Sequence, residues 1–331
     1  MKIIIPMAGI GKRMRPHTLS VPKPLLKIAG KSIVERLVEK LGDKKKNIEE
    51  IHFVIGNFGK EVEEILLKLA EVNGARGYIH YQKEALGTAH AVFSAAEALN
   101  GEVIIAFADT LFIGDFVIRD EDEAIIWTKV VKNPEKYGVV KEDSKGMIID
   151  FIEKPENFVS NKAIIGIYYF KNAEIIKIEI DRIIKNDKKV GGEYQLTDGL
   201  RNMLAGKVRF KCKVIDEWLD CGNKDMFLKS CMRIVEIEDQ KQSEYNEYGN
   251  RIVKPVYISK NTKIKNSVIG PYVCIEDNTY ISDSNIENSM IGRYTVIEGS
   301  TIRNSILGNQ TVILGAKGEL NLGDFNRYEG K

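Results

Sequence analysis

Two glycines and a group of cations follow the first apolar segment of the chain. Gly9 and Gly11 come directly after residues 2–8 (KIIIPMA), and three cations come next, Lys12, Arg13 and Arg15. Glycine lets backbone N–H groups approach an anion without interference from a Cβ, and arginine can bind two phosphate oxygens at once. The dinucleotide-binding fingerprint would need a third glycine at position 14, and a Walker A loop has a different spacing. The stretch therefore suits a polyphosphate, and a purely structural turn between strand and helix is the alternative.

The continuation of this stretch carries a family resemblance. Residues 9–25 fit the pattern GxGxRxxPxT…PKPL, and YQKEALGTAHA, AFADT, YGVV, IEKP, IIGIYYF and WLDCGNKDMF follow in order. This series resembles the sugar-1-phosphate nucleotidylyltransferase family, nearest to the long-form glucose-1-phosphate thymidylyltransferases with a C-terminal left-handed β-helix. Each motif is short, but their joint occurrence over residues 3–227 is specific.

The resemblance implies an enzyme that transfers a nucleotidyl group from a nucleoside triphosphate to a sugar 1-phosphate and releases pyrophosphate. Because two anions must meet, such catalysis depends on positioning and charge neutralisation, and the resemblance gives this role to Arg13 and Lys23. It places the nucleotide at six residues: Ala8, Gly9, Gly11, Gln82, Leu86 and Gly87. It places the sugar phosphate at four more: Gly138, Glu153, Lys154 and Gly166.

The cofactor implied by the resemblance is Mg²⁺, held by Asp109 and Asp220. Magnesium takes few protein carboxylates and completes its octahedron with phosphate oxygens and waters, so two aspartates suffice. The structural alternative is that each aspartate caps a neighbouring segment, and Gln82 could similarly do no more than close a strand. We expect Asp198 in EYQLTD to cap a helix.

The choice of substrates rests on weaker signals. A pyrimidine triphosphate, dTTP or UTP, is favoured because the side-chain amide of Gln82 can both donate to and accept from a pyrimidine edge. The resemblance favours glucose 1-phosphate as the sugar. A mannose-1-phosphate guanylyltransferase and a non-catalytic scaffold or regulatory homologue stay open as alternatives. Departures from the family pattern include Lys12, where serine or threonine is usual, and Ala108, where glycine is common.

Regular elements that could position these residues alternate along the first two-thirds of the chain. Apolar runs predict strands over residues 2–8, 51–56, 78–82 and 102–110, and helical periodicity predicts helices over 32–43, 59–72 and 87–99. Such alternation indicates a doubly wound, three-layer α/β domain with a mostly parallel sheet, whose ligands bind beyond the carboxyl ends of the strands. We expect this nucleotidyltransferase domain, with a connecting helix over 223–240, to span residues 1–240.

A different period begins near Pro255. Twelve aliphatic residues recur at intervals of five or six from Ile252 to Ile313, and all but Leu307 are isoleucine. This is the hexapeptide pattern of a left-handed parallel β-helix, expected over residues 251–316 in about four coils. Residues 241–250 are expected to form a linker, and 317–331 an aperiodic tail. The chain has four histidines, none beyond His90, so the β-helix lacks the histidine that acetyl transfer would need.

The bulk composition gives little reason to expect a charged macromolecular partner. The 331 residues carry 49 basic and 47 acidic side chains, for a formal charge of +2, which favours neither nucleic acid nor an anionic membrane. The four cysteines form no CxxC pair, and neither a signal peptide nor a long apolar run is evident. We therefore expect a cytoplasmic protein, and the flat faces of a β-helix favour a homo-oligomer.

Overall fold

The computed structural model describes residues 1–42, 47–238 and 249–330. The chain divides into two compact units. The sheet unit comprises Met1–Gly9 and Glu35–Trp218, and the β-helix unit comprises Ile10–Val34 and Leu219–Lys331. This division differs from the predicted boundary after residue 240, because residues 10–34 and the segment from Leu219, with the connecting helix, belong to the β-helix unit. Most of the predicted linker, 241–248, lies outside the described residues.

The centre of the sheet unit is a parallel sheet in the order β6-β1-β4-β5. Its strands are β1 (Lys2–Pro6), β4 (Glu50–Ile55), β5 (Arg76–Tyr81) and β6 (Val103–Ala106). Ile3, Ile4 and Ile5 of β1 are fully buried although they point alternately to the two faces of the sheet. Helices therefore cover both faces, as the three-layer α/β prediction required.

Antiparallel strands extend this sheet beyond β6. They are β8 (Ala124–Val130), β9 (Gly138–Glu142), β10 (Ile148–Glu153) and β11 (Lys162–Phe170), with β12 (Phe210–Val214) parallel to β8. Strand β11 is the junction, since it pairs with β6, β8 and β9. The sheet is thus parallel on the side predicted from the βαβ pattern and mainly antiparallel on the other.

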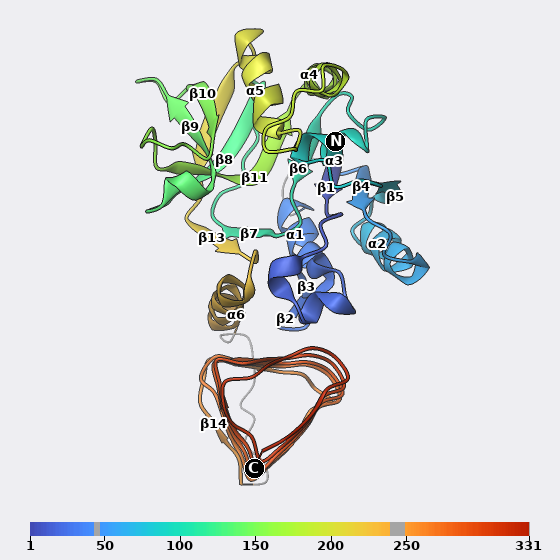
Figure 1. Cartoon of the computed structure of the whole chain (residues 1–331), viewed down its shortest axis with the longest axis vertical. Helices are drawn as coiled ribbons and strands as arrows, with labels where there is room; N and C mark the ends of the chain where they lie inside the picture. The colour runs from blue at the N-terminus through green and yellow to red at the C-terminus, as the bar shows by residue number, and fades with distance from the viewer. Residues whose placement is uncertain (43–46, 239–248, 331) are drawn as a thin grey trace. The chain divides into compact units, whose positions relative to one another are not determined.

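Five helices lie between these strands along the chain (Figure 1). They are α1 (Ile33–Gly42), α2 (Lys60–Val72), α3 (Thr88–Phe93), α4 (Ala173–Lys185) and α5 (Leu196–Ala205). One core cluster joins Val92 of α3, Ile180 of α4 and Leu200 of α5 to Ile4 and Ile105 of the strands. The third predicted helix is shorter than expected, because residues 94–98 form turns.

Residues 251–329 form three parallel sheets of five strands each, consistent with the predicted left-handed β-helix, and its triangular coils are seen end-on in Figure 1. The first sheet contains β14 (Arg251–Ile252), β17 (Val268–Ile269), β20 (Asn285–Glu287), β23 (Thr301–Arg303) and β26 (Lys317–Gly318). The second contains β15 (Val256–Ile258), β18 (Val273–Ile275), β21 (Ser289–Ile291), β24 (Ile306–Leu307) and β27 (Asn321–Leu322). The third contains β16 (Lys263–Lys265), β19 (Tyr280–Ser282), β22 (Val296–Glu298), β25 (Val312–Leu314) and β28 (Arg327–Glu329).

The repeat brings like residues into register from coil to coil. Ile264 pairs with Ile281, and Ile297 with Ile313, so that buried isoleucines stack along the interior. The predicted tail of residues 317–331 is wrong in part, because β26, β27 and β28 complete a fifth coil. The positions in register with the inward residues of the preceding coil carry Gly318, Leu322 and Tyr328, which hides the isoleucine period in the sequence.

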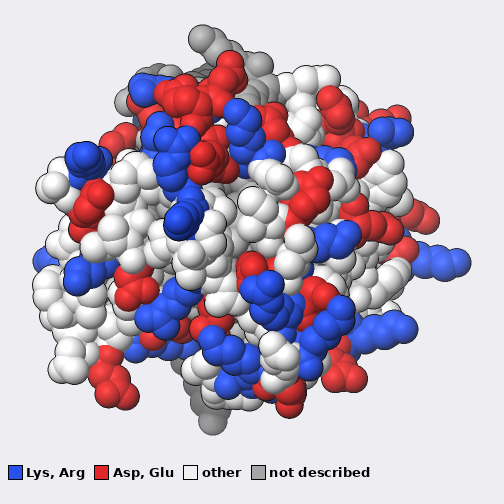
Figure 2. Space-filling view, turned by 90° about the horizontal axis from the view of Figure 1, so that it is seen from above, with Lys and Arg blue, Asp and Glu red and all other residues white. Residues whose placement is uncertain are grey.

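The predicted connecting helix is α6 (Lys224–Glu238), which contacts β15, β18 and β21 of the second β-helix sheet. Short pairs complete the fold: β2 (Lys27–Ile28) with β3 (Lys31–Ser32), and the strands β7 (Thr110–Ile113) and β13 (Glu217–Asp220). Among the residues that the structure describes, no helix has both the length and the apolarity to cross a membrane. On the face shown in Figure 2, cations and anions are interspersed, in keeping with the balanced composition.

Candidate functional site

Three predicted site residues of the sheet unit follow the carboxyl ends of parallel strands. Ala8 comes two residues after β1, Gln82 directly after β5, and Asp109 three residues after β6. The backbone N–H of Gln82 donates to the Ile55 carbonyl at the end of β4, which continues the sheet hydrogen bonding by one residue. Because these strands are parallel neighbours, the three residues lie along one edge of the sheet, where α/β folds bind ligands.

The predicted base-binding residues contact one another. Nε2 of Gln82 donates to the Gly87 carbonyl at 3.3 Å and lies 3.2 Å from Nδ1 of His90. Two fixed contacts on its amide nitrogen orient the Gln82 side chain. The backbone of Leu86 is also held, because its carbonyl accepts from the Tyr194 N–H at 2.8 Å.

Gly87 is the position where a side chain cannot be accommodated. Its φ is +104°, and a Cβ there would lie 2.6 Å from the Tyr194 carbonyl oxygen and 2.8 Å from its nitrogen. The segment around Tyr194 therefore packs directly on the Leu86–Gly87 turn. Ala89 extends this contact by donating its N–H to the same Tyr194 carbonyl at 3.0 Å.

The same segment reaches the predicted sugar-binding residues. Oγ1 of Thr197 donates to Oε2 of Glu153 at 3.3 Å, and the Leu196 N–H donates to Oγ1 of Thr88 at 3.0 Å. A Cβ on Gly138 would lie 2.9 Å from Oε2 of Glu153, so the carboxylate approaches a backbone without a side chain. Residues 193–197 therefore connect the Gln82–His90 group with the Gly138–Glu153 pair.

Burial governs the ionisation of Glu153. Desolvation raises the pKa of its carboxyl, with Asp198 and Glu193 adding to the effect, while Lys154 and Thr197 oppose it. The carboxylate oxygens of Glu153 can accept hydrogen bonds from the hydroxyl groups of a ligand, as Oε2 does from Thr197. Lys154, next in sequence, has a positive φ of 43° and donates its N–H to the Tyr137 carbonyl at 3.1 Å.

Asp109 lies in a turn, not at the end of the predicted 102–110 strand, because β6 stops at Ala106. The turn is tied to β11 on both sides of the aspartate. Phe107 donates its N–H to the Gly166 carbonyl at 2.9 Å, and Oγ1 of Thr110 donates to the Ile165 carbonyl at 2.6 Å. Gly166, a predicted sugar-binding residue, thus contributes to fixing the half-buried Asp109.

Gly9 is the last residue of the first segment of the sheet unit, and the other remaining predicted residues belong to the β-helix unit. Gly11 has a φ of +66°, its carbonyl accepts from Oγ1 of Thr18 at 2.9 Å, and a Cβ there would lie 3.2 Å from Cβ of Lys23. Lys23 is 8% exposed, whereas Arg13 is exposed to solvent. The glycine turn and the two predicted catalytic cations therefore share one compact loop, residues 10–26, which we call the cationic loop.

Asp220 ends β13 and closes a local turn, since its Oδ1 accepts from the Gly222 N–H at 2.6 Å. Asp109 and Asp220 offer hard carboxylate oxygens, which are the protein ligands that Mg²⁺ prefers. No cluster of three or more potential ligands occurs among the described residues. A cation that draws most of its ligands from phosphates and water needs no such cluster, so this pair fits Mg²⁺ by donor chemistry.

Sequence reasoning missed the linking role of Tyr194 and Thr197. In their motif, EYQLTD, only Asp198 carried a prediction. The predicted capping role of Asp198 is wrong. Asp198 lies in the first turn of α5 and its Oδ1 is 3.4 Å from Nζ of Lys188, while Gln195 occupies the cap position. The only available signal was a run of polar residues directly before a helix.

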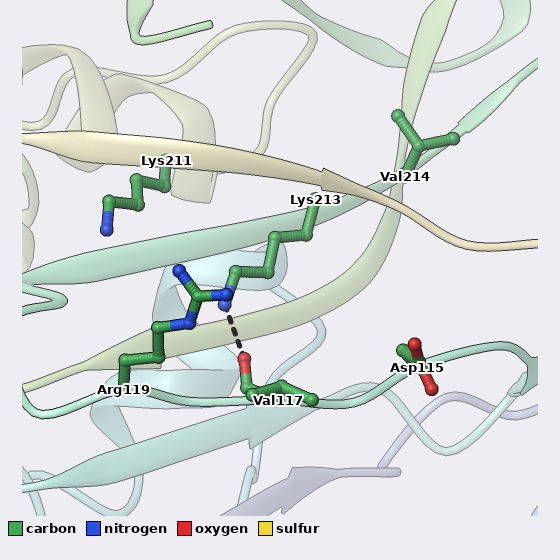
Figure 3. Close-up of a pocket in the computed structure, with 6 residues that line it drawn as sticks. All are labelled: Asp115, Val117, Arg119, Lys211, Lys213 and Val214. Atoms are coloured by element: carbon green, nitrogen blue, oxygen red, sulfur yellow. Dashed lines mark hydrogen bonds between the residues drawn. The ribbon is translucent and has the colours of Figure 1, made fainter.

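A separate pocket of the sheet unit contains none of the predicted site residues. It measures about 340 Å³ and is lined by Asp115, Val117, Arg119, Lys211, Lys213 and Val214. Figure 3 shows the Lys213 ammonium bonded to the Val117 carbonyl, with Arg119 beside it. Lys211 and Lys213 also pair with the buried Asp122, whose pKa is lowered by these contacts. The charges of the two lysines that line the pocket are therefore balanced by Asp122.

Comparison with known proteins gives the class of the chain. Residues 2–236 match the nucleotidyl transferase family, so the chain belongs to that family. The bifunctional protein GlmU of Methanococcus vannielii is 28% identical over 91% of this chain and 73% of its own length. GlmU of Methanocaldococcus jannaschii is 33% identical over 67% of this chain, which spans about half (51%) of that relative. The mannose-1-phosphate guanylyltransferase catalytic subunit beta of Drosophila melanogaster is 30% identical over 80% of this chain and 70% of its own length.

Proposed function

We propose that this protein transfers a nucleotidyl group from a nucleoside triphosphate to a sugar 1-phosphate. The observation that carries the proposal is the family match over residues 2–236. All the charged residues that the resemblance assigns to the reaction lie within that range. The presence of Arg13, Lys23, Lys154, Asp109 and Asp220 together argues against a non-catalytic scaffold, which would have no use for them.

In the proposed reaction, a phosphate oxygen of the sugar 1-phosphate attacks the α-phosphorus, and the bond to the β-phosphate oxygen breaks. Arg13 binds the β- and γ-phosphates and the departing pyrophosphate, and Lys23 neutralises charge near the α-phosphorus. Lys154 binds the phosphate of the sugar. No proton transfer or covalent protein intermediate is required, so the protein contributes position and charge.

Asp109 and Asp220 would hold Mg²⁺, which supplies Lewis-acid neutralisation of the phosphate oxygens when bound. Gln82 and Gly87 would meet the nucleobase, with the amide oriented by the contacts described above. Glu153 would exchange hydrogen bonds with sugar hydroxyls, and Gly138 lets that carboxyl lie close to the backbone. The nucleotide would contact backbone atoms of Ala8, Gly9, Gly11 and Leu86.

For the specific substrates, we propose glucose 1-phosphate with dTTP or UTP. The argument is the match of the Gln82 amide to a pyrimidine edge and the PKPL motif with a β-helix. A second pair, mannose 1-phosphate with GTP, is favoured by the name of the Drosophila relative at 30% identity. We further propose a cytoplasmic location, since the four cysteines are free and thiols stay reduced there. We also propose a homo-oligomer, because the flat faces of the β-helix favour self-association. A molar mass of a single chain measured by light scattering would contradict the proposed homo-oligomer.

A substrate panel tests the proposal. The full chain is incubated with Mg²⁺, one of dTTP, UTP, GTP, ATP or CTP, and glucose or mannose 1-phosphate, and pyrophosphate release is measured. We expect release with a pyrimidine triphosphate and glucose 1-phosphate, and its loss on chelation with EDTA. Release only with GTP and mannose 1-phosphate would select the second pair, and no release from any pair would contradict transfer to these two sugar phosphates.

A further inference from the structure

The cationic loop and the hairpin after it are hydrogen-bonded to the β-helix at both ends of one sheet. Residues 16–20 contact β27 and the turn after it, in the last coil. Residues 27–30 contact β15 and the turn after β18, in the first two coils. All of these strands belong to the second β-helix sheet, β15-β18-β21-β24-β27.

The contact with the last coil is made by polar side chains. Nε2 of His17 lies 2.8 Å from Oδ1 of Asn321, and Oγ of Ser20 donates to Oδ2 of Asp324 at 2.8 Å. His17 is only 4% exposed, and because the amide oxygen of Asn321 can only accept, Nε2 of His17 is the donor. The His17–Asn321 hydrogen bond is part-buried, since the His17 ring is buried and Asn321 is exposed.

The β-helix side of this contact is itself held in place. Oδ1 of Asp324 accepts from the Asn309 N–H at 2.7 Å, which ties it to the preceding coil. A Cβ on Gly323 would lie 3.1 Å from Cβ of Pro16, so the loop packs directly on the β-helix backbone. The last coil therefore offers the loop a rigid, complementary surface.

A second anchor holds the hairpin that follows the loop. The Gly30 N–H donates to Oε1 of Glu276 at 2.9 Å, and Nζ of Lys27 lies 4.0 Å from Oε2 of the same carboxylate. The hydroxyl of Tyr257 lies against Gly30, where a Cβ would be 2.3 Å away. Glu276 is 6% exposed, so the acceptor of this anchor is buried, whereas the Lys27 side chain is partly exposed.

The first anchor adjoins the parts of the loop assigned to phosphate binding. Thr18, next to His17, donates from Oγ1 to the Gly11 carbonyl, and its Cγ2 would lie 3.0 Å from a Cβ on Gly11. Cβ of Lys23 would lie 3.2 Å from the same Cβ position on Gly11. A shift at His17 is therefore transmitted through Thr18 to the glycine turn next to Arg13 and Lys23.

We propose that the β-helix positions the cationic loop for the triphosphate, with His17 and Asn321 as the positioning pair. The inference rests on the proposed function, because it assigns the loop to the nucleotide. The β-helix then contributes to nucleotide binding without contributing a ligand of its own. A β-helix that served only as a scaffold would tolerate loss of the Asn321 side chain without a specific kinetic effect.

The kinetic test compares Asn321→Ala with Asn285→Ala, an exposed strand asparagine of another β-helix sheet. Loss of one hydrogen bond worth about 0.5–1.5 kcal/mol corresponds to roughly a two- to tenfold effect. We expect KM for the nucleoside triphosphate to rise by about that factor in Asn321→Ala, with KM for the sugar phosphate unchanged. Asn321→Asp, which keeps an acceptor for His17, should restore the wild-type KM, and Asn285→Ala should match wild type.

Hydrogen exchange of the full-length chain separates this inference from the proposed function, since it needs no turnover. Amides of residues 10–26 should exchange faster in Asn321→Ala than in wild type and in Asn285→Ala, with the parallel sheet unchanged. Unaltered exchange over residues 10–26 would overturn the tether even in an active enzyme. Faster exchange with an unchanged KM would overturn the positioning role, and a wild-type chain inactive on every pair would contradict only the proposed function.

Discussion

Gly87 shows how single residues set the spacing within the candidate site. The Tyr194 backbone lies where a side chain on Gly87 would be. Residues 193–197 can therefore reach both the Leu86–Gly87 turn and Glu153. At this scale the contacts are made chiefly by backbone atoms and short polar side chains. The sequence showed which loops carry site residues, but it did not show which loops touch.

We predict that Gly87→Ala destabilises the sheet unit by about 2–4 kcal/mol, since it adds a steric clash to an unfavourable φ. Gly74→Ala is the matched control, because Gly74 also has a positive φ (+76°) but nothing lies within 4 Å of its Cβ position. That control should lose about 1 kcal/mol. The measurement is the free energy of unfolding in urea, and equal losses in both variants would refute the proposed packing.

The predicted site residues differ in how well the sequence located them. Gln82 with Gly87, and Gly138 with Glu153, are contacts between residues of predicted motifs, and the structure brings both pairs together. Tyr194 and Thr197 carry no chemical signature, and their role arises from hydrogen bonds across more than forty residues of sequence. Such contacts depend on the tertiary fold and leave no local pattern.

Among the elements, β4 and β5 carry a buried histidine pair outside the candidate site. Nδ1 of His52 lies 2.9 Å from Nε2 of His80, Nε2 of His52 lies 3.1 Å from Glu50, and Nδ1 of His80 lies 3.8 Å from Glu97. Burial lowers the pKa of both rings below the usual 6.5, against the attraction of the two carboxylates. The folded state therefore favours neutral rings.

We predict that the free energy of unfolding falls as the pH drops below about 6.5. Between 6.5 and the lower folded pKa values, the unfolded chain binds more protons than the folded chain, so acidification favours unfolding. Urea titrations at pH 7.5, 6.5 and 5.5 measure the slope. The double variant His52→Gln, His80→Gln should show a smaller slope, and an unchanged slope would contradict this origin.

The β-helix was the element most readily predicted, because one inward isoleucine every five or six residues has no other common explanation. Its fifth coil was missed, since Gly318 and Tyr328 replace isoleucine there. The antiparallel half of the large sheet was also missed, because its strand order depends on pairing between distant segments. Periodicity identifies an element, and pairing is a property of the assembled fold.

We predict that Ile286→Ala, in the stack of β20, costs about 2–5 kcal/mol of unfolding free energy, because the side chain is fully buried and leaves a cavity. The adjacent outward residue provides the control. Glu287→Ala should change stability by less than about 0.5 kcal/mol. Urea unfolding followed by circular dichroism would measure both, and a smaller loss for Ile286→Ala than for Glu287→Ala would contradict the inward assignment.

In the whole molecule, residues 10–34 leave the sheet unit and belong to the β-helix unit before the chain returns at Glu35. The residues assigned to the reaction are thereby divided. Arg13, Lys23 and Asp220 lie in one unit, and Asp109, with the nucleobase and sugar residues, lies in the other. The two-domain interpretation of the sequence did not anticipate this division of the predicted residues between the units.

The most direct test of the central claim is pyrophosphate release by Arg13→Ala and Asp109→Asn, one variant from each unit. With the substrates that the wild type turns over, we predict a loss of about a hundredfold or more in kcat/KM for each, at unchanged thermal stability. Arg251→Ala and Asp283→Asn, exposed residues of the β-helix, are the matched controls and should retain wild-type rates. Undiminished release by Arg13→Ala and Asp109→Asn would contradict the account.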